Sequence, residues 1–339
     1  MNKTLIASDS PVYQDFICVL NKNLETSVET IFIDSTGNLG INKFIRHISY
    51  FIVAAKAFSR RKHYKYIIFI QQFIGIYYSL ICSIFFFERK RPISIVVPLI
   101  YAERKGLLGR FYRLIVSSVL ASNYINVFIV HSSSERDTYL KIFGYKFRGK
   151  ILFVKYGRNI YYSPSNSEYI EEDYLFSGGT TNRDYITLVE AFRNIQDKLI
   201  IACFEHDISG IEIPPNVRVV HNVFGDRFFD YISKSSAVIM PIRNPEISSG
   251  QLVVLAAMAL GKPIIATSGA CLEDYLDANC AIMVKARDPA SIIDAIEELR
   301  NDVNNKRRIA SSCYERYKEE LTLEKYAQRI SDLMKCLYE

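Results

Sequence analysis

The sequence lacks the cysteine and histidine patterns that mark metal-binding and disulfide-rich proteins. Its 7 cysteines are an odd number and are widely scattered, with no Cys-x-x-Cys pair and no Cys/His cluster at zinc spacing. Cysteines distributed in this way predict reduced thiols in a cytoplasmic protein. They exclude a small secreted domain that is held together by disulfides.

A long uninterrupted hydrophobic run is also missing. The most apolar stretch, residues 66–87, is broken by Gln71 and Gln72, and its β-type start and helical continuation predict a strand and then a helix. A basic segment follows this aromatic helix, so the helix either packs in the core or lies along a bilayer surface. Residues 1–9 contain a short apolar run that meets an acid at once, which predicts a first strand rather than a secretory signal.

Length and composition indicate a globular protein of two domains. Of the 339 residues, 49% are hydrophobic and 23% are charged, which supplies ample apolar material for buried cores. The net charge of +6 is unevenly divided, because residues 1–155 carry 22 Lys/Arg and 9 Asp/Glu, a net charge of +13, and the remainder has a net charge of −7. The basic clusters predict binding to anionic lipid, nucleic acid or a phosphorylated substrate, unless they only solvate the surface.

Short β-type apolar runs alternate with helical patterns along the chain, which is typical of α/β proteins with doubly wound parallel sheets. We expect strands at residues 4–7, 30–33, 66–70, 93–97, 127–130, 151–154, 174–177, 198–203, 217–221, 237–241, 263–266 and 281–284. The polar segment 155–167 predicts a linker between domains 1–155 and 156–321. Residues 322–339 predict a C-terminal helix that packs back toward the first domain.

Two segments of the second domain combine a buried strand, a glycine-containing loop and a helix. In residues 174–192, a strand runs into Gly178 and Gly179, then into a polar loop with Arg183, then into a helix. Bare glycines and a helix N-terminus let a diphosphate approach the backbone, and Arg183 supplies compensating charge. A simple tight turn has the same pattern.

The second segment, residues 237–267, places a polar loop directly after a buried strand. Ser248, Ser249 and Gly250 open a helix of small residues, Gly261 ends it, and another buried strand follows. Ligands of α/β proteins bind at the carboxyl ends of parallel strands, so both loops are candidates for one ligand site.

The run 257–267, Ala-Met-Ala-Leu-Gly-Lys-Pro-Ile-Ile-Ala-Thr, together with both loop segments, resembles the nucleotide-sugar-binding domain of GT-B glycosyltransferases, closest to the large retaining family four. The resemblance covers most of the chain. It implies a GT-B fold, in which two Rossmann-like doubly wound α/β domains face a central cleft. It also implies a hexosyltransferase-type enzyme that binds a nucleoside-diphosphate sugar on the second domain and a glycan acceptor on the first.

The resemblance assigns roles to the loop residues. That family holds the donor phosphate with an arginine and a lysine. In this chain Arg183 stands at the position of the family's lysine, and Gly179 stands at the position of its arginine, so one of the two cations is retained. Ser248 and Ala256 replace the two family glutamates, and Glu246 is a substitute carboxylate. Donor contacts are therefore expected from Gly178, Gly179, Arg183, Glu246, Ser248, Ser249, Gly250 and Gln251.

Catalysis is expected from Arg183 and one carboxylate of the first domain. Arg183, the glycine amides and a helix N-terminus would stabilise the departing diphosphate, and the sequence has no Asp-x-Asp motif, so no metal or other cofactor is expected. The family's histidine is missing after strand 93–97. Glu103, in the polar loop that follows, is the candidate base unless it only pairs with Arg104, and His131 is expected to be structural.

Together these features predict an enzyme on the inner face of the cytoplasmic membrane. Its partners would be a nucleotide-sugar donor, a glycan or lipid-linked acceptor and the anionic membrane surface, in the synthesis of a bacterial surface polysaccharide such as O-antigen or capsule. Nucleic-acid binding is not expected, because the basic clusters lie with buried helices rather than in a recognition motif. Two alternatives stay open: a catalytically inactive GT-B-like scaffold that binds a glycan or a partner, and a sugar-nucleotide epimerase.

Overall fold

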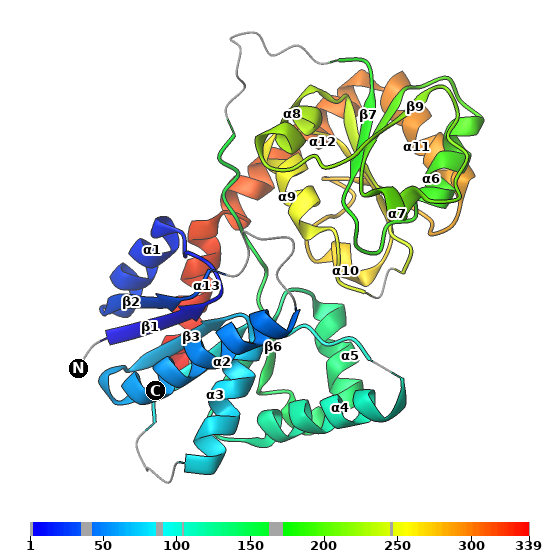
Figure 1. Ribbon diagram of the computed structural model, residues 1–339. Coiled ribbons are helices and arrows are strands. Elements are labelled where there is room, and N and C mark those ends of the chain that lie inside the picture. The colour runs from blue at the N-terminus through cyan, green and yellow to red at the C-terminus, as the bar shows by residue number, and fades with distance from the viewer. Residues whose placement is uncertain are drawn as a thin grey trace. The chain divides into compact units, whose positions relative to one another are not determined.

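The computed structural model describes residues 3–34, 43–85, 91–103, 105–162, 172–244 and 247–338, and it divides into two compact units. Unit 1 consists of Met1–Val154 and Leu323–Glu339, and unit 2 consists of Lys155–Thr322. Each unit contains a parallel sheet of six strands, joined by helices (Figure 1). The expected α/β fold class is confirmed in both units.

The sheet of unit 1 has the order β2-β1-β3-β4-β5-β6. Its strands are β1 (Lys3–Ser8), β2 (Ser27–Phe32), β3 (Tyr66–Ile70), β4 (Ile93–Val97), β5 (Val127–Val130) and β6 (Ile151–Phe153). The central strands are apolar and buried, as expected for a parallel sheet that is covered on both faces. The helices are α1 (Gln14–Leu24), α2 (Lys43–Arg60), α3 (Gln72–Phe85), α4 (Gly106–Ala121), α5 (Ser133–Phe143) and α13 (Leu323–Cys336).

The direction of each crossover decides which face of the unit 1 sheet a helix covers. The helices α2, α3, α4 and α5 all join strands that advance in the same direction, from β2 toward β6. Parallel crossovers are right-handed, so these four helices lie on one face. The helix α1 joins β1 to β2 in the opposite direction and lies on the other face, where it packs against α13 (Figure 1).

The sheet of unit 2 has the order β12-β11-β10-β7-β8-β9. Its strands are β7 (Leu175–Gly178), β8 (Leu199–Ala202), β9 (Val217–Val220), β10 (Ala237–Met240), β11 (Ile264–Thr267) and β12 (Ile282–Val284). Its helices are α6 (Tyr185–Arg193), α7 (Glu205–Ile208), α8 (Asp226–Lys234), α9 (Gln251–Ala259), α10 (Ala270–Glu273), α11 (Pro289–Asn301) and α12 (Val303–Glu320). The order reverses between β7 and β10, which creates a topological switch point.

Local sequence signals set the ends of several helices in unit 2. The Asp184 side chain accepts a hydrogen bond from the Thr187 N–H at 3.2 Å and so caps α6; Asp288 and Asp302 cap α11 and α12 in the same way. Gly261 follows the end of α9 with a φ of +60°, a left-handed conformation that glycine adopts without strain.

All of the expected strands are present, and their ends lie within three residues of the expected ones. Residues 66–85 form β3 and then α3, and Tyr78 in the middle of α3 is 2% exposed, so most of this helix packs in the core. The aromatic residues Phe86 and Phe87, which suggested contact with a bilayer, lie outside the described residues. No helix in the described part of the chain is long and apolar enough to cross a membrane.

Candidate functional site

The carboxyl ends of β7 and β10 lie side by side in the unit 2 sheet. Gly178 ends β7 and leads into the loop 179–184, and Met240 ends β10 and leads into residues 241–250 before α9. Ligands of open parallel sheets bind in the crevice outside such a switch point. The fold therefore brings together the two loops that the sequence analysis singled out.

Hydrogen bonds join these two loops into one continuous surface. The Asn182 side chain accepts from the Asn244 N–H at 3.0 Å and donates to the Asn244 carbonyl at 2.8 Å and to Ser249 Oγ at 3.1 Å. The Arg243 N–H donates to the Asn182 carbonyl at 3.0 Å. Asn182 has a φ of +59°, a left-handed conformation in which asparagine is enriched. Its side chain thus acts as a clamp between the loops.

Arg183 is buried between the loops, with 5% of its surface exposed. Its Nε donates to the Gly178 carbonyl at 3.0 Å, and its Nη1 donates to the Thr181 carbonyl at 2.7 Å. Burial lowers the pKa of the guanidinium, and no carboxylate among the described residues forms an ion pair with it. A buried cation without a carboxylate partner is costly in free energy, so an anionic ligand at this edge would stabilise it.

The glycines after β7 are required by packing. A Cβ on Gly178 would lie 2.7 Å from the Phe228 ring, and a Cβ on Gly179 would lie 2.6 Å from Arg183 Nη2. The Gly179 N–H donates to the Ala202 carbonyl at 3.0 Å, next to the pairing of β7 with β8. The expectation that both glycine amides are free for a diphosphate is therefore wrong for Gly179, whose small size instead admits the arginine.

The second loop leads into the N-terminus of α9. Gly250 has a φ of +92°, and a Cβ there would lie 2.9 Å from the Met240 methyl group, so backbone and packing both favour glycine. Ser249 is 5% exposed, and Gln251 Nε2 donates to Ser248 Oγ at 2.5 Å. A helix N-terminus carries unpaired N–H groups and a partial positive charge, both of which favour an anion here.

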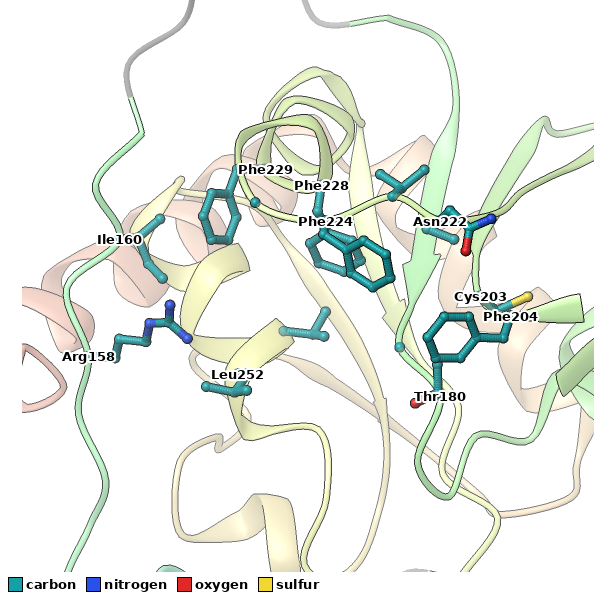
Figure 2. Close-up of a pocket in the computed structure, with 15 residues that line it drawn as sticks. Arg158, Ile160, Thr180, Cys203, Phe204, Asn222, Phe224, Phe228, Phe229 and Leu252 are labelled. Atoms are coloured by element: carbon teal, nitrogen blue, oxygen red, sulfur yellow. The ribbon is translucent and has the colours of Figure 1, made fainter. Parts of the chain in front are cut away.

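A cavity of about 390 Å³ opens beside these loops, and all of its lining residues belong to unit 2 (Figure 2). It lies at the carboxyl ends of β7, β8 and β9, and Thr180 and Asn222 contribute polar groups to its wall. Phenylalanine side chains supply much of the rest: Phe204, Phe224, Phe228 and Phe229. Aromatic walls with a few polar groups suit a flat and partly polar organic group.

Arg158 brings to this cavity a cation that the sequence analysis did not assign to the site. Its N–H donates to the Leu321 carbonyl at 2.9 Å, and its carbonyl accepts from the Tyr317 hydroxyl at 3.0 Å, so its backbone is fixed against the end of α12. Figure 2 shows the Arg158 guanidinium directed into the cavity, on the side of Leu252 in the first turn of α9. In the sequence, Arg158 directly follows Gly157 in the predicted linker 155–167, and this arginine was the feature that could have indicated the site.

The two candidate groups of unit 1 have different environments. Glu103 has a side chain that is 65% exposed, with Oε1 3.8 Å from Arg113 Nη1, and the expected partner Arg104 lies outside the described residues. His131 follows β5, and its Nε2 lies 2.8 Å from the Tyr326 hydroxyl of α13. Burial lowers the pKa of His131 to about 4, so the ring is neutral near pH 7 and joins β5 to α13.

Few other side chains of the cavity are charged or reactive. Of the 15 described residues that line it, only Arg158 has a charged side chain, and burial raises the pKa of the Cys203 thiol to about 12, so this thiol stays protonated. Glu246, the expected substitute carboxylate, lies outside the described residues. Within those residues, no three His, Cys, Asp or Glu side chains are grouped to hold a metal ion.

Known proteins resemble this chain at two levels. Residues 171–302, most of unit 2, match the family described as "Glycosyl transferases group 1". No curated protein matches the sequence. Sucrose-phosphate synthase from Thermosynechococcus elongatus superimposes with a TM-score of 0.70 at 17% identity, with 99% of each chain covered. The Anabaena protein HepE in complex with UDP gives 0.68 at 13% identity, with 99% of this chain and 100% of that chain covered.

A third structure, a glycosyltransferase from Rickettsia africae, gives a TM-score of 0.67 at 11% identity and covers 100% of this chain and 99% of its own. These likenesses extend over both units and define a protein of the GT-B fold. The family match covers most of unit 2 and shows that this unit is similar to the glycosyl transferases of group 1. The expected fold and enzyme class are therefore confirmed.

Proposed function

We propose that this glycosyltransferase moves a sugar from a nucleoside-diphosphate sugar to a lipid-linked glycan, in the synthesis of a bacterial surface polysaccharide such as O-antigen or capsule. The observation that carries the donor assignment is the cavity of unit 2, where a phenylalanine wall meets the Arg158 guanidinium and the N-terminus of α9. A nucleoside diphosphate has the two matching parts, a flat base and a charged diphosphate. UDP and UDP-glucose, bound by HepE, belong to the same chemical class.

We propose one orientation for the donor in this cavity. The base lies against Phe204 and Phe224, whose ring centroids are 5.9 Å apart, with Asn222 as a polar contact. The diphosphate lies between Arg158 and the first turn of α9, because both supply positive charge. The remaining donor contacts come from the neighbouring loop residues Gly178, Ser248, Ser249, Gly250 and Gln251, and Gly179, whose N–H is bonded to Ala202, only lines the cavity wall.

The reaction exchanges one bond at the anomeric carbon. An acceptor hydroxyl oxygen bonds to that carbon, the bond from the carbon to the diphosphate oxygen breaks, and its electron pair leaves with the nucleoside diphosphate. Arg158 binds the developing charge directly and Arg183 stabilises it from behind the loop, so two guanidiniums supply the charge and no metal ion is required. Glu103 of unit 1 accepts the proton of the acceptor hydroxyl.

The charge of unit 1 supports a lipid-linked acceptor. Residues 1–155 carry a net charge of +13, which attracts both a lipid diphosphate and anionic head groups. The enzyme then works as a peripheral protein on the inner face of the cytoplasmic membrane.

The test is a transfer and hydrolysis assay with a panel of nucleotide sugars, run with and without chelator, on the wild type, Arg183→Ala and Arg183→Lys. We expect turnover with at least one donor, insensitive to chelator. Arg183→Ala is expected to lose most nucleotide affinity. The substitution removes the positive charge, and it also removes the hydrogen-bond donor of the Gly178 and Thr181 carbonyls. The matched control is Arg193→Ala, an exposed arginine of α6 that pairs with Glu212.

Two results would reject the proposal. Absence of turnover with every donor, together with unchanged nucleotide binding by Arg183→Ala, would favour the inactive scaffold. Conversion of the donor sugar without any acceptor would favour an epimerase.

A further inference from the structure

The helix α4 exposes apolar side chains along its outward face. Leu107 and Leu108 are 82% and 84% exposed, and Phe111 and Leu114 are 63% and 67% exposed. Leu107, Phe111 and Leu114 follow one another at intervals of four and three residues, so they form a single stripe along the helix. The opposite side of α4 is buried through residues such as Val116. A surface helix of a globular protein normally presents polar residues on its outward face.

Two neighbouring helices extend this surface. Phe44 and Phe51 of α2 are 70% and 50% exposed, and Phe85 at the end of α3 is 69% exposed. The helix α3 contacts both α2 and α4, and right-handed crossovers place all three on one face of the unit 1 sheet. We define the apolar face of unit 1 by six of these side chains: Phe44, Phe51, Phe85, Leu107, Leu108 and Phe111.

Aromatic contacts confirm that the three helices are adjacent. The ring of Phe51 on α2 lies 6.0 Å from that of Tyr77 on α3, and the ring of Phe73 on α3 lies 6.4 Å from that of Tyr112 on α4. The three helices therefore present their exposed side chains on the same side of unit 1. An exposed apolar patch of this kind marks a site of interaction with a protein or a membrane.

The charge around the apolar face is almost entirely positive. Residues 35–134 contain 14 Lys/Arg and 2 Asp/Glu, and α2, α3 and α4 contain no acidic residue. Lys105 and Arg110 are exposed beside the leucines of α4. A second copy of the chain would bring this basic surface against itself, which like-charge repulsion disfavours. A bilayer with anionic head groups supplies both an apolar interior and the opposite charge.

We propose that the apolar face of unit 1 docks on a bilayer that contains anionic lipid. Leu107, Leu108 and Phe111 enter the boundary between head groups and acyl chains, and Lys105 and Arg110 contact lipid phosphates. The inference rests on the proposed function, whose acceptor is lipid-linked, and it names the surface by which the enzyme reaches that acceptor.

The test is sedimentation of the full chain with vesicles of phosphatidylethanolamine, prepared with and without phosphatidylglycerol. The wild type is expected to bind vesicles that contain phosphatidylglycerol, and Leu107→Ser with Leu108→Ser is expected to weaken binding by more than about tenfold. Arg110→Glu is expected to weaken it by about fivefold or more, since each basic residue near the surface contributes about that factor. The matched control combines Ile186→Ser and Val303→Ser, two exposed apolar residues of unit 2.

Circular dichroism of each variant establishes that it is folded. Wild-type binding by the folded leucine variant would overturn the proposal. So would a dimer in size-exclusion chromatography that this variant dissociates, since the face would then be an interface between copies. Turnover of a water-soluble acceptor does not require docking and should be unchanged in the leucine variant, so loss of vesicle binding and failure of the proposed glycosyl transfer are separate results.

Discussion

Asn182 and Asn244 form a reciprocal pair of hydrogen bonds, in which the Asn182 side chain bonds to both backbone groups of Asn244 at 2.8 and 3.0 Å. Each asparagine belongs to a different loop of the switch point, so one side chain aligns two segments that lie 62 residues apart in the sequence. These hydrogen bonds hold the loop surface of the proposed donor site in one arrangement, which reduces the ordering that ligand binding must induce.

We expect Asn182→Ala to lower the free energy of unfolding by about 1–2 kcal/mol, because the side-chain hydrogen bonds to the Asn244 N–H, the Asn244 carbonyl and Ser249 Oγ are lost. Nucleotide affinity should fall as well, because the loops are no longer aligned. Denaturant unfolding and calorimetric titration with UDP measure the two effects. Asn194→Ala is the control, since the Asn194 side chain donates to the Glu190 carbonyl at the end of α6, away from both loops. Equal behaviour of the two variants would show that the clamp has no role in binding.

Arg158→Ala is expected to weaken UDP binding by about 10-fold to 100-fold, the value of one charge-assisted hydrogen bond. Uridine binding should change little, because the guanidinium is assigned to the diphosphate. Arg158→Lys should recover part of the affinity, since it restores the charge without the bidentate geometry. Arg218→Ala, at an exposed arginine of β9, is the control. Parallel losses for UDP and uridine would mean that Arg158 shapes the cavity and does not bind phosphate.

Glu103→Gln tests the proposed base. We expect kcat to fall by about 10²–10⁴-fold with donor affinity unchanged, because the variant keeps the shape of the side chain and cannot accept a proton. Asp137→Asn is a closely matched control. The side chains of Asp137 and Glu103 are 64% and 65% exposed, and each has a carboxylate oxygen 3.8 Å from an arginine Nη1, that of Arg136 and that of Arg113 respectively. A kcat of Glu103→Gln equal to that of Asp137→Asn would assign the base elsewhere.

His131 makes unit 1 sensitive to acid. Burial holds its pKa at about 4, below the 6.5 of the unfolded chain, so between these values the unfolded state binds one more proton. Stability contributed by the neutral ring is therefore complete above about pH 6.5 and is lost as the pH falls toward 4, by about 3 kcal/mol in total. Denaturant unfolding at several pH values measures this slope. His131→Gln should flatten it, whereas Tyr326→Phe, which removes only the hydroxyl at 2.8 Å, should preserve it.

The fold follows largely from local patterns in the sequence. The strand at residues 93–97 was expected with the ends that β4 has, because a buried parallel strand is a short apolar run between polar turns. The helix end at Gly261 was expected because a left-handed residue at that point requires glycine. In both cases the residues that determine the element lie within it or next to it in the sequence.

The tertiary structure alone decided which atoms of the site are available. Gly179 stands in a loop that suggests a free amide, but its N–H pairs with Ala202 on the neighbouring strand. Arg158 stands in a turn that suggests a linker, but Leu321 and Tyr317, about 160 residues further along the chain, fix its backbone beside the cavity. The sequence by itself determined the two units, their strands and the two loops of the switch point, because those depend on periodicity and turn residues. Hydrogen-bond partners and side-chain directions depend on which distant segments meet, and only the folded chain settles that.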